Sequence, residues 1–373
     1  MNWRRRWFNE FLEEAESLDR YDVGLTAERL ARRLGTDPSQ ILKLNSNENL
    51  FIPLSFLRKL LREVVEELDP RFYPRDELVD LRYAIARKMG VSDEQIVIGS
   101  GSDQLIELIV YAFLRRKDRV ISIDPTFSIY MRAVRARGAH YMPVPLKDDF
   151  SLDIDSLLHV ADTMRAKLLF LCSPNNPTAN QFDKDSIRRI LEGFDGIVII
   201  DETYVDFARY STVEWIREFD NLIVLRTFSK VYGIAGLRLG YAISNREISS
   251  VIRERFKMPY AVSSVTLRMG LKLIENDAFI KQKIQEVKKV RSNLILNLKS
   301  LNNVKPFKSD TNFVLFSLSK MSSERAYNQL LEQGIIIRNI GRVLNFKNCL
   351  RVTVAPPQIM KKFITALREV VEE

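Results

Sequence analysis

Three short apolar runs, each followed closely by polar residues, mark the middle of the chain. The runs are Lys167–Cys172, Gly196–Ile200 and Asn221–Leu225. A run of this length fits one buried strand. The polar residues that follow them, Asn176, Asp201 and Lys230, are 25 and 29 residues apart. Each interval has room for a helix and a return strand. The spacing therefore predicts parallel strands whose carboxyl ends carry these groups, where α/β sheets bind their ligands.

Helical and strand patterns continue on both sides of this segment. Apolar periodicity predicts helices over 56–68, 76–89, 105–113 and 324–332, and a longer helical stretch over 262–298. Short apolar runs predict strands at 95–98, 119–123, 312–316, 334–338 and 350–354. Near the N-terminus, one helical face is apolar and consists of Phe8, Phe11, Leu12, Ala15 and Leu18. This pattern predicts an amphipathic helix that packs on the body of the protein or on a partner subunit.

Composition narrows the class of protein. A chain of 373 residues suggests a large domain and a smaller one, and 46% hydrophobic with 28% charged residues is ordinary for a globular protein. The net charge of +9 suits nucleic acid, an anionic surface or phosphorylated small molecules. Acidic residues are mixed with the basic ones, which favours phosphorylated ligands. Cys172 and Cys349 have neither disulfide nor metal spacing, which fits core thiols in a reducing cytoplasm. No apolar stretch reaches the roughly 18 residues of a membrane span.

Lys230 lies just after the third apolar run, ahead of a loop that contains three glycines and Arg238. Taken alone, it reads as a solvated surface lysine, because Lys is rarely buried without a partner. The alternative is a Schiff-base lysine, which loses its proton when it is desolvated near another cation and then attacks an aldehyde. The residues at the neighbouring strand ends distinguish a surface lysine from a Schiff-base lysine.

Together these motifs resemble those of the fold-type I aminotransferases that use pyridoxal 5′-phosphate, and more narrowly the histidinol-phosphate aminotransferases. The resemblance covers about Leu44 to Val354 and is carried by Ser173–Thr178, Asp201–Tyr204, Arg226–Lys230 and Gly236–Tyr241. It implies an α/β fold, with a large domain built on a mostly parallel seven-stranded sheet between helices and a smaller α+β domain. The expected divisions are an N-terminal helix and active-site arm at 1–50, a cofactor-binding domain at 51–265 and a small domain at 266–373.

The resemblance also assigns roles around the cofactor ring. Lys230 would hold the cofactor covalently and transfer the proton. Asp201 would pair with the pyridine nitrogen and keep it protonated, since a nearby carboxylate favours the cationic form. Asn176 and Tyr204 would bind the 3′-oxygen of the ring. Phe127 stands where the family often has a tyrosine that stacks on the ring, so stacking is expected without that tyrosine's hydrogen bond.

A phosphate site is expected at a turn of small residues that opens a helix, because the first turn of a helix presents free N–H groups and a positive dipole end. By resemblance, Ser102 and the backbone of Asp103 form this site together with the Ser229 hydroxyl and Arg238. Tyr73 resembles the tyrosine that reaches the cofactor phosphate of the other subunit, which implies a homodimer with its active site at the interface.

Substrate contacts are expected from two further regions. The Asn-x-Asn-Glu segment that ends at Glu48 resembles one that folds over the active-site mouth, and Asn49 is expected to contact substrate there. Leu50 stands where the family usually has a proline. Arg338 and Arg351 lie in apolar strands, where an unpaired arginine is costly, so both are expected to face an anionic ligand.

The function that the resemblance implies is transamination between histidinol phosphate and glutamate or 2-oxoglutarate, in histidine biosynthesis. No metal, nucleic acid or membrane is expected to take part, and a cytoplasmic location is expected. An aromatic or broad-range aminotransferase and a threonine-phosphate decarboxylase stay open as alternatives within the same family. A non-catalytic regulator on the same fold is disfavoured, because no helix-turn-helix pattern precedes Leu44.

Overall fold

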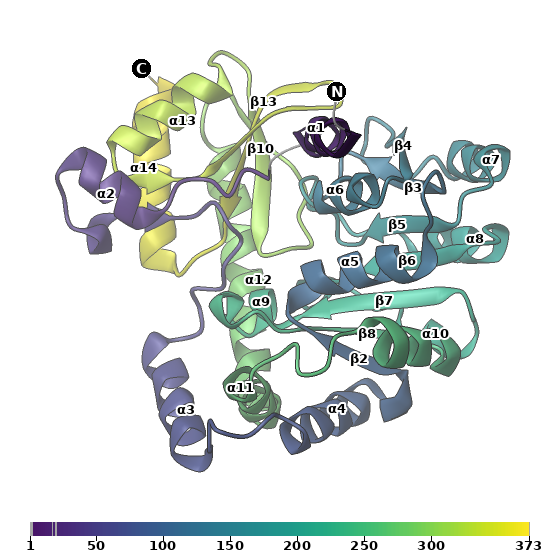
Figure 1. Cartoon of the computed structure of the whole chain (residues 1–373). Helices are drawn as coiled ribbons and strands as arrows, with labels where there is room; N and C mark the ends of the chain where they lie inside the picture. The colour runs from purple at the N-terminus through teal and green to yellow at the C-terminus, as the bar shows by residue number, and fades with distance from the viewer. Residues whose placement is uncertain (1–2, 17, 19–20, 373) are drawn as a thin grey trace.

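A seven-stranded sheet organises the larger part of the protein, in a computed structural model that describes residues 3–16, 18 and 21–372 (Figure 1). In spatial order its strands are β2 (Ile96–Gly99), β8 (Gly240–Ser244), β7 (Leu222–Thr227), β6 (Ile197–Asp201), β5 (Leu168–Cys172), β3 (Arg119–Asp124) and β4 (His140–Pro145). Neighbouring strands are parallel except β8, which is antiparallel to both β2 and β7. The predicted mostly parallel sheet of seven strands is confirmed.

Successive residues of each strand face opposite sides of the sheet and enter two separate apolar clusters. On β6, for example, Ile199 packs in one cluster and Ile200 in the other. The first side is covered by α5 (Gly101–Phe113) and α6 (Ile129–Ala136), and the second by α4 (Asp76–Met89), α7 (Ile154–Met164), α8 (Lys184–Gly193) and α11 (Ser264–Glu275). Because both faces are buried, β5, β6 and β7 each contain an unbroken apolar run, as the sequence shows.

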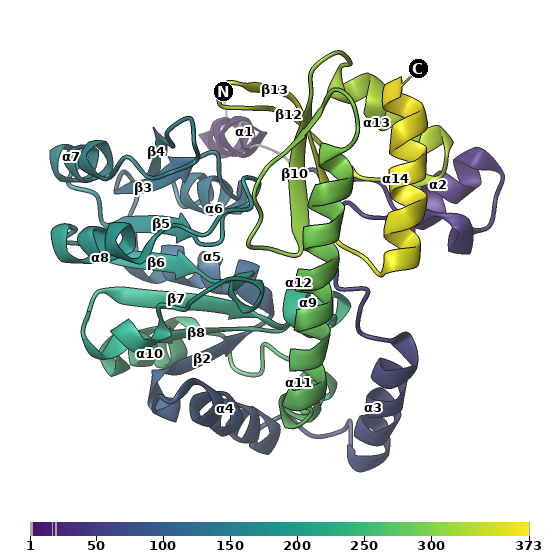
Figure 2. The same cartoon turned by 180° about the vertical axis from the view of Figure 1, so that it is seen from behind.

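A second, antiparallel sheet lies beside the first (Figure 2). It is formed by β12 (Arg338–Val343), β13 (Phe346–Thr353), β10 (Phe313–Leu318) and β9 (Val304–Pro306), and α13 (Ser323–Glu332) and α14 (Pro357–Glu372) pack together at its side. Near it, β1 (Leu42–Lys43) pairs in parallel with β11 (Ile335–Ile336), so residues from the N-terminal arm join the C-terminal part of the chain. α2 (Ala27–Leu34) contributes Leu30 and Ala31 to the apolar cluster at this contact. The residue limits of the three expected divisions remain a prediction.

The long helical stretch expected over 262–298 is divided in two. α11 ends at Glu275, and α12 (Asp277–Lys299) begins after Asn276, whose backbone leaves the helical range at φ −93° and ψ 30°. α12 then runs past the larger sheet to the smaller one (Figure 2). Its buried residues belong to the same cluster as the second face of the large sheet. It therefore connects the two parts of the protein through a shared core.

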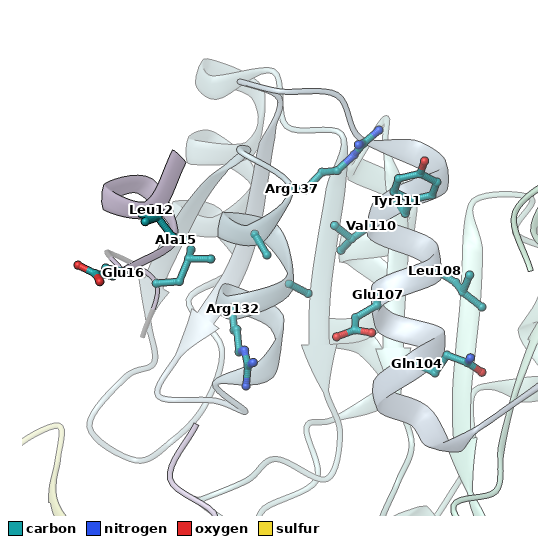
Figure 3. Close-up of a pocket in the computed structure, with 13 residues that line it drawn as sticks. Leu12, Ala15, Glu16, Gln104, Glu107, Leu108, Val110, Tyr111, Arg132 and Arg137 are labelled. Carbon is teal, nitrogen blue, oxygen red and sulfur yellow. The ribbon is translucent and has the colours of Figure 1, made fainter. Parts of the chain in front are cut away.

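The predicted N-terminal helix is present as α1 (Trp3–Glu16), but none of its residues is buried. Phe8 and Phe11 are 50% and 54% exposed. Leu12, Ala15 and Leu18 line a cavity of about 990 Å³ between this helix, α5 and α6 (Figure 3). Packing against the body of the protein is thus partial. Among the described residues, no helix is long and apolar enough to cross a membrane.

Candidate active site

A cavity of about 450 Å³ opens where β5, β6 and β7 end, bounded on the other side by the small sheet. All but two of the site residues expected from the sequence line it; the two exceptions are Asn49 and Tyr73. Those that line it are Ser102, Asp103, Phe127, Asn176, Asp201, Tyr204, Ser229, Lys230, Arg238, Arg338 and Arg351. The parallel strand ends therefore bring together groups that lie as far apart in the sequence as Ser102 and Arg351.

Lys230 projects from α9 (Phe228–Val231), a single turn that begins where β7 ends. The Thr227 hydroxyl caps this turn by accepting a hydrogen bond from the N–H of Ser229 at 3.1 Å. Lys230 Nζ donates to the carbonyl of Ser46 at 2.9 Å. Burial, aided by the positive charge of Arg351, lowers the pKa of Lys230 to about 8. A large fraction of this amine is consequently neutral and nucleophilic in weakly alkaline solution.

Asp201 is the last residue of β6 and is only 2% exposed. One carboxylate oxygen, Oδ1, accepts a hydrogen bond from the N–H of Thr203 at 3.0 Å. The other, Oδ2, accepts one from the hydroxyl of Tyr130 at 2.7 Å. Burial raises the pKa of Asp201, and these hydrogen bonds oppose that shift. Tyr130 was not among the site residues predicted from the sequence.

Tyr204 and Asn176 face the cavity with their polar atoms held by neighbours. The Tyr204 hydroxyl accepts a hydrogen bond from Asn47 Nδ2 at 3.0 Å, so its own hydrogen stays free to donate. Asn176 Oδ1 accepts one from Arg351 Nη1 at 2.6 Å, which leaves the two N–H groups of that amide free to donate. Both side chains are thereby prepared to donate to an oxygen in the cavity.

The arm segment contributes Asn47 to the cavity in place of Asn49. Asn49 is turned away, since its Nδ2 donates to the carbonyl of Val231 at 2.9 Å and its Oδ1 accepts from the N–H of Phe51 at 3.0 Å. The structure thus does not support the expected contact of Asn49 with substrate. Asn47 has a left-handed backbone, φ 54°, and lines the cavity beside Tyr204. Strain of this kind in a residue other than glycine is concentrated at functional sites.

The N-terminus of α5 forms one end of the cavity. Ser100, which precedes this helix, makes no side-chain capping bond, so the first N–H groups of the helix lack a side-chain acceptor from it. β8 approaches this turn so closely that a Cβ at Gly240 would lie 2.7 Å from the N atom of Ser102. Arg238 lies at the same end, with its Nη2 2.8 Å from Asp103 Oδ2. Free N–H groups and a guanidinium at one point make a suitable anion site.

Arg338 and Arg351 occupy directly opposite positions on the antiparallel strands β12 and β13. Like charges in this arrangement destabilise a sheet unless each has a partner. Arg338 Nη1 forms an ion pair with Asp22 Oδ2 at 2.9 Å. Arg351 Nη2 donates to the carbonyl of Asn45 at 2.7 Å, and its guanidinium lies over the Phe313 ring at 5.1 Å. Burial also lowers the pKa of Arg351. The two residues place a concentrated positive charge on the cavity wall.

Two buried polar atoms that belong to cavity residues have no hydrogen-bond partner among the described residues. They are Oδ1 of Asn47 and Nε of Arg351. Buried polar atoms are nearly always paired in folded proteins, so orphans on a cavity wall point to a bound polar ligand. In the part of the chain that the structure describes, no group of His, Cys, Asp and Glu side chains could hold a metal ion.

A family model for aminotransferases of class I and II matches residues 39–367. The chain belongs to the class I and II aminotransferases. This membership confirms the resemblance carried by the four strand-end motifs, and it makes the protein an enzyme of the transaminase type.

Relatives of this aminotransferase include two histidinol-phosphate aminotransferases. The one from Thermoanaerobacter sp. (strain X514) is 36% identical over 88% of this chain and 92% of its own length. The one from Christiangramia forsetii is 37% identical over 81% of this chain and 86% of its own. The solved histidinol-phosphate aminotransferase of Sinorhizobium meliloti, in complex with pyridoxal-5′-phosphate, superimposes with a TM-score of 0.86 at 25% identity and covers 96% of each chain. The expected fold class is confirmed.

The cavity residues of this aminotransferase fit pyridoxal 5′-phosphate. An amine of lowered pKa suits its aldehyde, and a buried carboxylate suits a ring nitrogen that carries a proton. β8 comes so close to α5 that a Cβ at Gly240 would meet the N atom of Ser102, and the glycine therefore leaves the helix N-terminus open to a phosphate. These donors lie on the strand ends, and the arginine pair faces them from the small sheet.

Behind the site, a buried ion pair fixes the residue that follows Asp201. Glu202 Oε2 lies 2.9 Å from Nε of Arg226, and both side chains are at least nine-tenths buried. Glu202 also accepts hydrogen bonds from the hydroxyl and N–H of Thr212. The chain at the end of β6 is therefore anchored to β7, the strand that leads to Lys230.

Arg226→Met is expected to reduce the free energy of unfolding by about 3–5 kcal/mol, because it leaves the Glu202 carboxylate buried without its cation. Urea denaturation followed by circular dichroism measures the change. Arg188→Met is the matched control, since Arg188 forms ion pairs on the surface and its loss should cost no more than about 1 kcal/mol. Equal losses for the two variants would contradict the anchoring role.

Proposed function

We propose that the protein catalyses transamination between histidinol phosphate and 2-oxoglutarate, with pyridoxal 5′-phosphate as its cofactor. The observation that carries this proposal is a single cavity in which a lysine of lowered pKa and a buried aspartate face a pair of arginines. The relatives named histidinol-phosphate aminotransferase support the choice of substrate, and they match most of this chain at 36–37% identity.

The side chains around the cofactor ring have different roles in the reaction. When bound, the cofactor supplies an electron sink for the bond that breaks at the substrate carbon. Lys230 holds the cofactor through Nζ and then carries a proton to and from the substrate carbon. Asp201 keeps a proton on the ring nitrogen. Tyr204 and Asn176 donate hydrogen bonds to the ring's 3′-oxygen from the orientations that Asn47 and Arg351 give them.

The N-terminus of α5 would hold the phosphate of the cofactor. Ser102 and the N–H of Asp103 lie in the first turn of this helix, and the Ser229 hydroxyl lies 3.4 Å from Arg238 Nη1. A guanidinium and helix N–H groups bind a phosphate through charge-assisted hydrogen bonds. Phe127 lines the cavity as well and offers its ring for stacking.

The arginine pair accounts for the use of two different substrates. Glutamate presents a carboxylate, whereas histidinol phosphate has a phosphate and no α-carboxylate, and a guanidinium binds either group in a bidentate fashion. Arg351 is placed to bind both in turn, since its Nε has no partner among the described residues. Arg338 binds the same anions after it exchanges Asp22 for them.

An assay of three substrates tests this proposal against its alternatives. Histidinol phosphate with 2-oxoglutarate should yield glutamate faster than any aromatic amino acid does. Phosphothreonine should release no CO₂. Solved decarboxylases share this fold, among them an L-threonine-O-3-phosphate decarboxylase from Porphyromonas gingivalis with a TM-score of 0.78, but at 24% identity the likeness is one of fold alone. Preference for an aromatic amino acid, or release of CO₂, would replace the proposed function.

Arg351→Ala is expected to lower kcat/KM by about 10- to 100-fold for both histidinol phosphate and glutamate, the loss expected for hydrogen bonds to a charged group. Steady-state kinetics of the two half-reactions provide the measurement. Arg342→Ala, on the same hairpin, is the control, because Arg342 donates to the carbonyl of Leu344 and does not line the cavity. A loss confined to one substrate would show that the two anions use different arginines.

We further propose a homodimer with Tyr73 at the interface. Tyr73 is 75% exposed and stacks on Tyr260 at 4.6 Å, outside the cavity of its own chain. Nearby in sequence, Val65 and Phe72 are 60% and 70% exposed. Such exposed apolar groups suit a subunit contact. A second copy would then place Tyr73 at the cofactor phosphate of its partner.

Phe72→Arg is expected to shift the protein from dimer to monomer, because it buries a charge in the proposed contact. Sedimentation equilibrium measures the mass. Leu296→Arg is the control, since Leu296 is a similarly exposed residue on α12, at 63%. A wild-type protein that is monomeric at micromolar concentration would contradict the proposal.

A cytoplasmic location is also inferred, since both cysteines are free and buried, and cell fractionation tests it.

A further inference from the structure

The hydroxyl of Tyr130 is directed at the carboxylate that faces the cavity. Tyr130 belongs to α6 and is fully buried, and its Oη donates to Asp201 Oδ2 at 2.7 Å. It does not line the cavity itself. β6 places Asp201 on the side of the sheet that α5 and α6 cover, as it does Ile199 two residues earlier. A residue of α6 can therefore reach Asp201 from behind.

Two aromatic neighbours hold the phenol ring in this position. The ring of Tyr130 stacks on Phe170 of β5, with centroids 4.9 Å apart and planes 11° from parallel. It also meets the edge of Phe127 at 5.6 Å and 86°. Both arrangements are favoured geometries for aromatic pairs. The hydroxyl consequently has little freedom to leave Asp201, and its position is coupled to that of the cavity residue Phe127.

The charge of Asp201 depends on very few groups. In the described part of the chain, no ion pair involves this carboxylate. Among the described residues, Oδ1 accepts a hydrogen bond from the N–H of Thr203, Oδ2 accepts one from the hydroxyl of Tyr130, and the side chain of Thr203 also bonds to the carboxylate. Burial favours the protonated acid, and hydrogen bonds to the charged form oppose it. Removal of the phenol oxygen would take away the hydroxyl donor that Oδ2 has in the described part of the chain.

We propose that Tyr130 is a positioning residue that keeps Asp201 oriented and ionised toward the ring nitrogen of the cofactor. This inference rests on the proposed function, which assigns Asp201 to that nitrogen. Tyr130 touches neither substrate nor cofactor. Its effect is transmitted through one hydrogen bond, so it should disappear when Asp201 is removed.

A double-mutant cycle tests the inference with Tyr130→Phe, Asp201→Ala and the combined variant. Titration of each protein with pyridoxal 5′-phosphate, followed by visible absorption, gives the cofactor Kd. Tyr130→Phe is expected to raise this Kd about tenfold in the wild-type background, as expected for a hydrogen bond to a charged group. In the Asp201→Ala background, Tyr130→Phe should change the cofactor Kd less than about twofold. Turnover should fall through kcat more than through KM.

The pH titration of the bound cofactor supplies a second readout. A ring nitrogen that loses its proton no longer repels the proton on the lysine-linked nitrogen. Tyr130→Phe should therefore move the midpoint of the visible absorption change to higher pH. Tyr141→Phe is the matched control, because Tyr141 is a largely buried phenol of the same apolar cluster that is bonded to Ser122 instead of Asp201. Its Kd and midpoint should equal those of the wild type.

If Tyr130→Phe does not fold, 3-fluorotyrosine at position 130 tests the same bond. This more acidic phenol is a stronger donor, so the midpoint should lie at or below that of the wild type. Equal effects of Tyr130→Phe in both backgrounds, or a higher midpoint with 3-fluorotyrosine, would overturn the inference. If Asp201→Ala itself leaves both Kd and midpoint unchanged, the assignment of Asp201 in the proposed function fails instead, which separates the two conclusions.

Discussion

Lys230→Ala is expected to lower turnover by at least about 10³-fold, because it removes both the group that holds the cofactor and the group that moves the proton. The loss should be seen with histidinol phosphate and with glutamate alike. Mass spectrometry after borohydride reduction measures the covalent link directly. The wild-type protein should carry the cofactor on Lys230, and the variant should release it on dialysis.

The same amine predicts a pH dependence in the cofactor-free protein. The pKa of Lys230 is lowered to about 8, mainly by burial, so the reactive neutral form increases as the pH rises through that value. The rate at which added pyridoxal 5′-phosphate becomes covalently bound should therefore rise between about pH 7 and 9 and level off above. An ordinary exposed lysine would keep gaining reactivity up to about pH 11.

Lys288→Ala provides the control for both measurements. Lys288 lies on α12, is partly buried and donates to the carbonyl of Ala208 at 3.1 Å, away from the cavity. Its removal should leave turnover and cofactor binding within about twofold of the wild type. Turnover that survives in Lys230→Ala, or a cofactor bound equally well by that variant after reduction, would refute the assigned role of the lysine.

The strands that end at the cavity were predictable because burial on both faces leaves a continuous apolar run. β5 and β6 lie within one residue of the predicted runs, and β7 continues two residues beyond its run, to Thr227. Two other strands of the sheet were not predicted. β4 contains Pro143 and Pro145, which argue against a strand but are tolerated at the sheet edge where β4 lies. β8 is a short buried strand, and its sequence does not indicate that it is antiparallel to its neighbours.

The cavity residues at strand ends were predictable for the same reason, whereas those on the arm were not. Asn47 and Asn49 are both asparagines in one polar segment, and which of them enters the cavity depends on the left-handed backbone at Asn47. That conformation is stabilised by contacts from distant parts of the chain. The N–H of Asn47 donates to the hydroxyl of Thr353, and its carbonyl accepts from Asn312 Nδ2. Contacts between residues so far apart in the chain cannot be predicted from the residues that adjoin Asn47 in the sequence.

The pairing of Arg338 with Arg351 across two strands could likewise not be predicted from the sequence. Each of Arg338 and Arg351 was expected to face an anion, on the ground that a strand arginine needs a partner. Their direct opposition on β12 and β13 depends on irregular pairing, with register shifts on either side of Gly341. Tyr130 lies three residues after Phe127, one helical turn away, but only the packing of α6 on the sheet brings it to Asp201.

Asp201→Asn is expected to lower kcat by about 10²- to 10³-fold, the range seen when one preorganised electrostatic group is removed from a reaction site. The amide has nearly the shape of the carboxylate, and its one oxygen can still accept a hydrogen bond from either Thr203 or Tyr130, which bond to different oxygens of Asp201. It carries no charge, however, and cannot hold a proton on the ring nitrogen. Because Lys230 is unchanged, the cofactor should stay covalently bound. The variant should therefore remain yellow while its turnover falls.

Asp310→Asn is the matched control for this variant, since Asp310 is another buried carboxylate, 6% exposed, whose Oδ2 accepts from the N–H of Gln181 outside the cavity. It should affect stability and leave kcat within about twofold. Single-turnover absorption of the bound cofactor, mixed with histidinol phosphate, distinguishes slow chemistry from slow binding. A normal rate of that first turnover in Asp201→Asn would mean that the ring nitrogen needs no carboxylate. The buried position of Asp201, with a donor on each oxygen, would then have only a structural purpose.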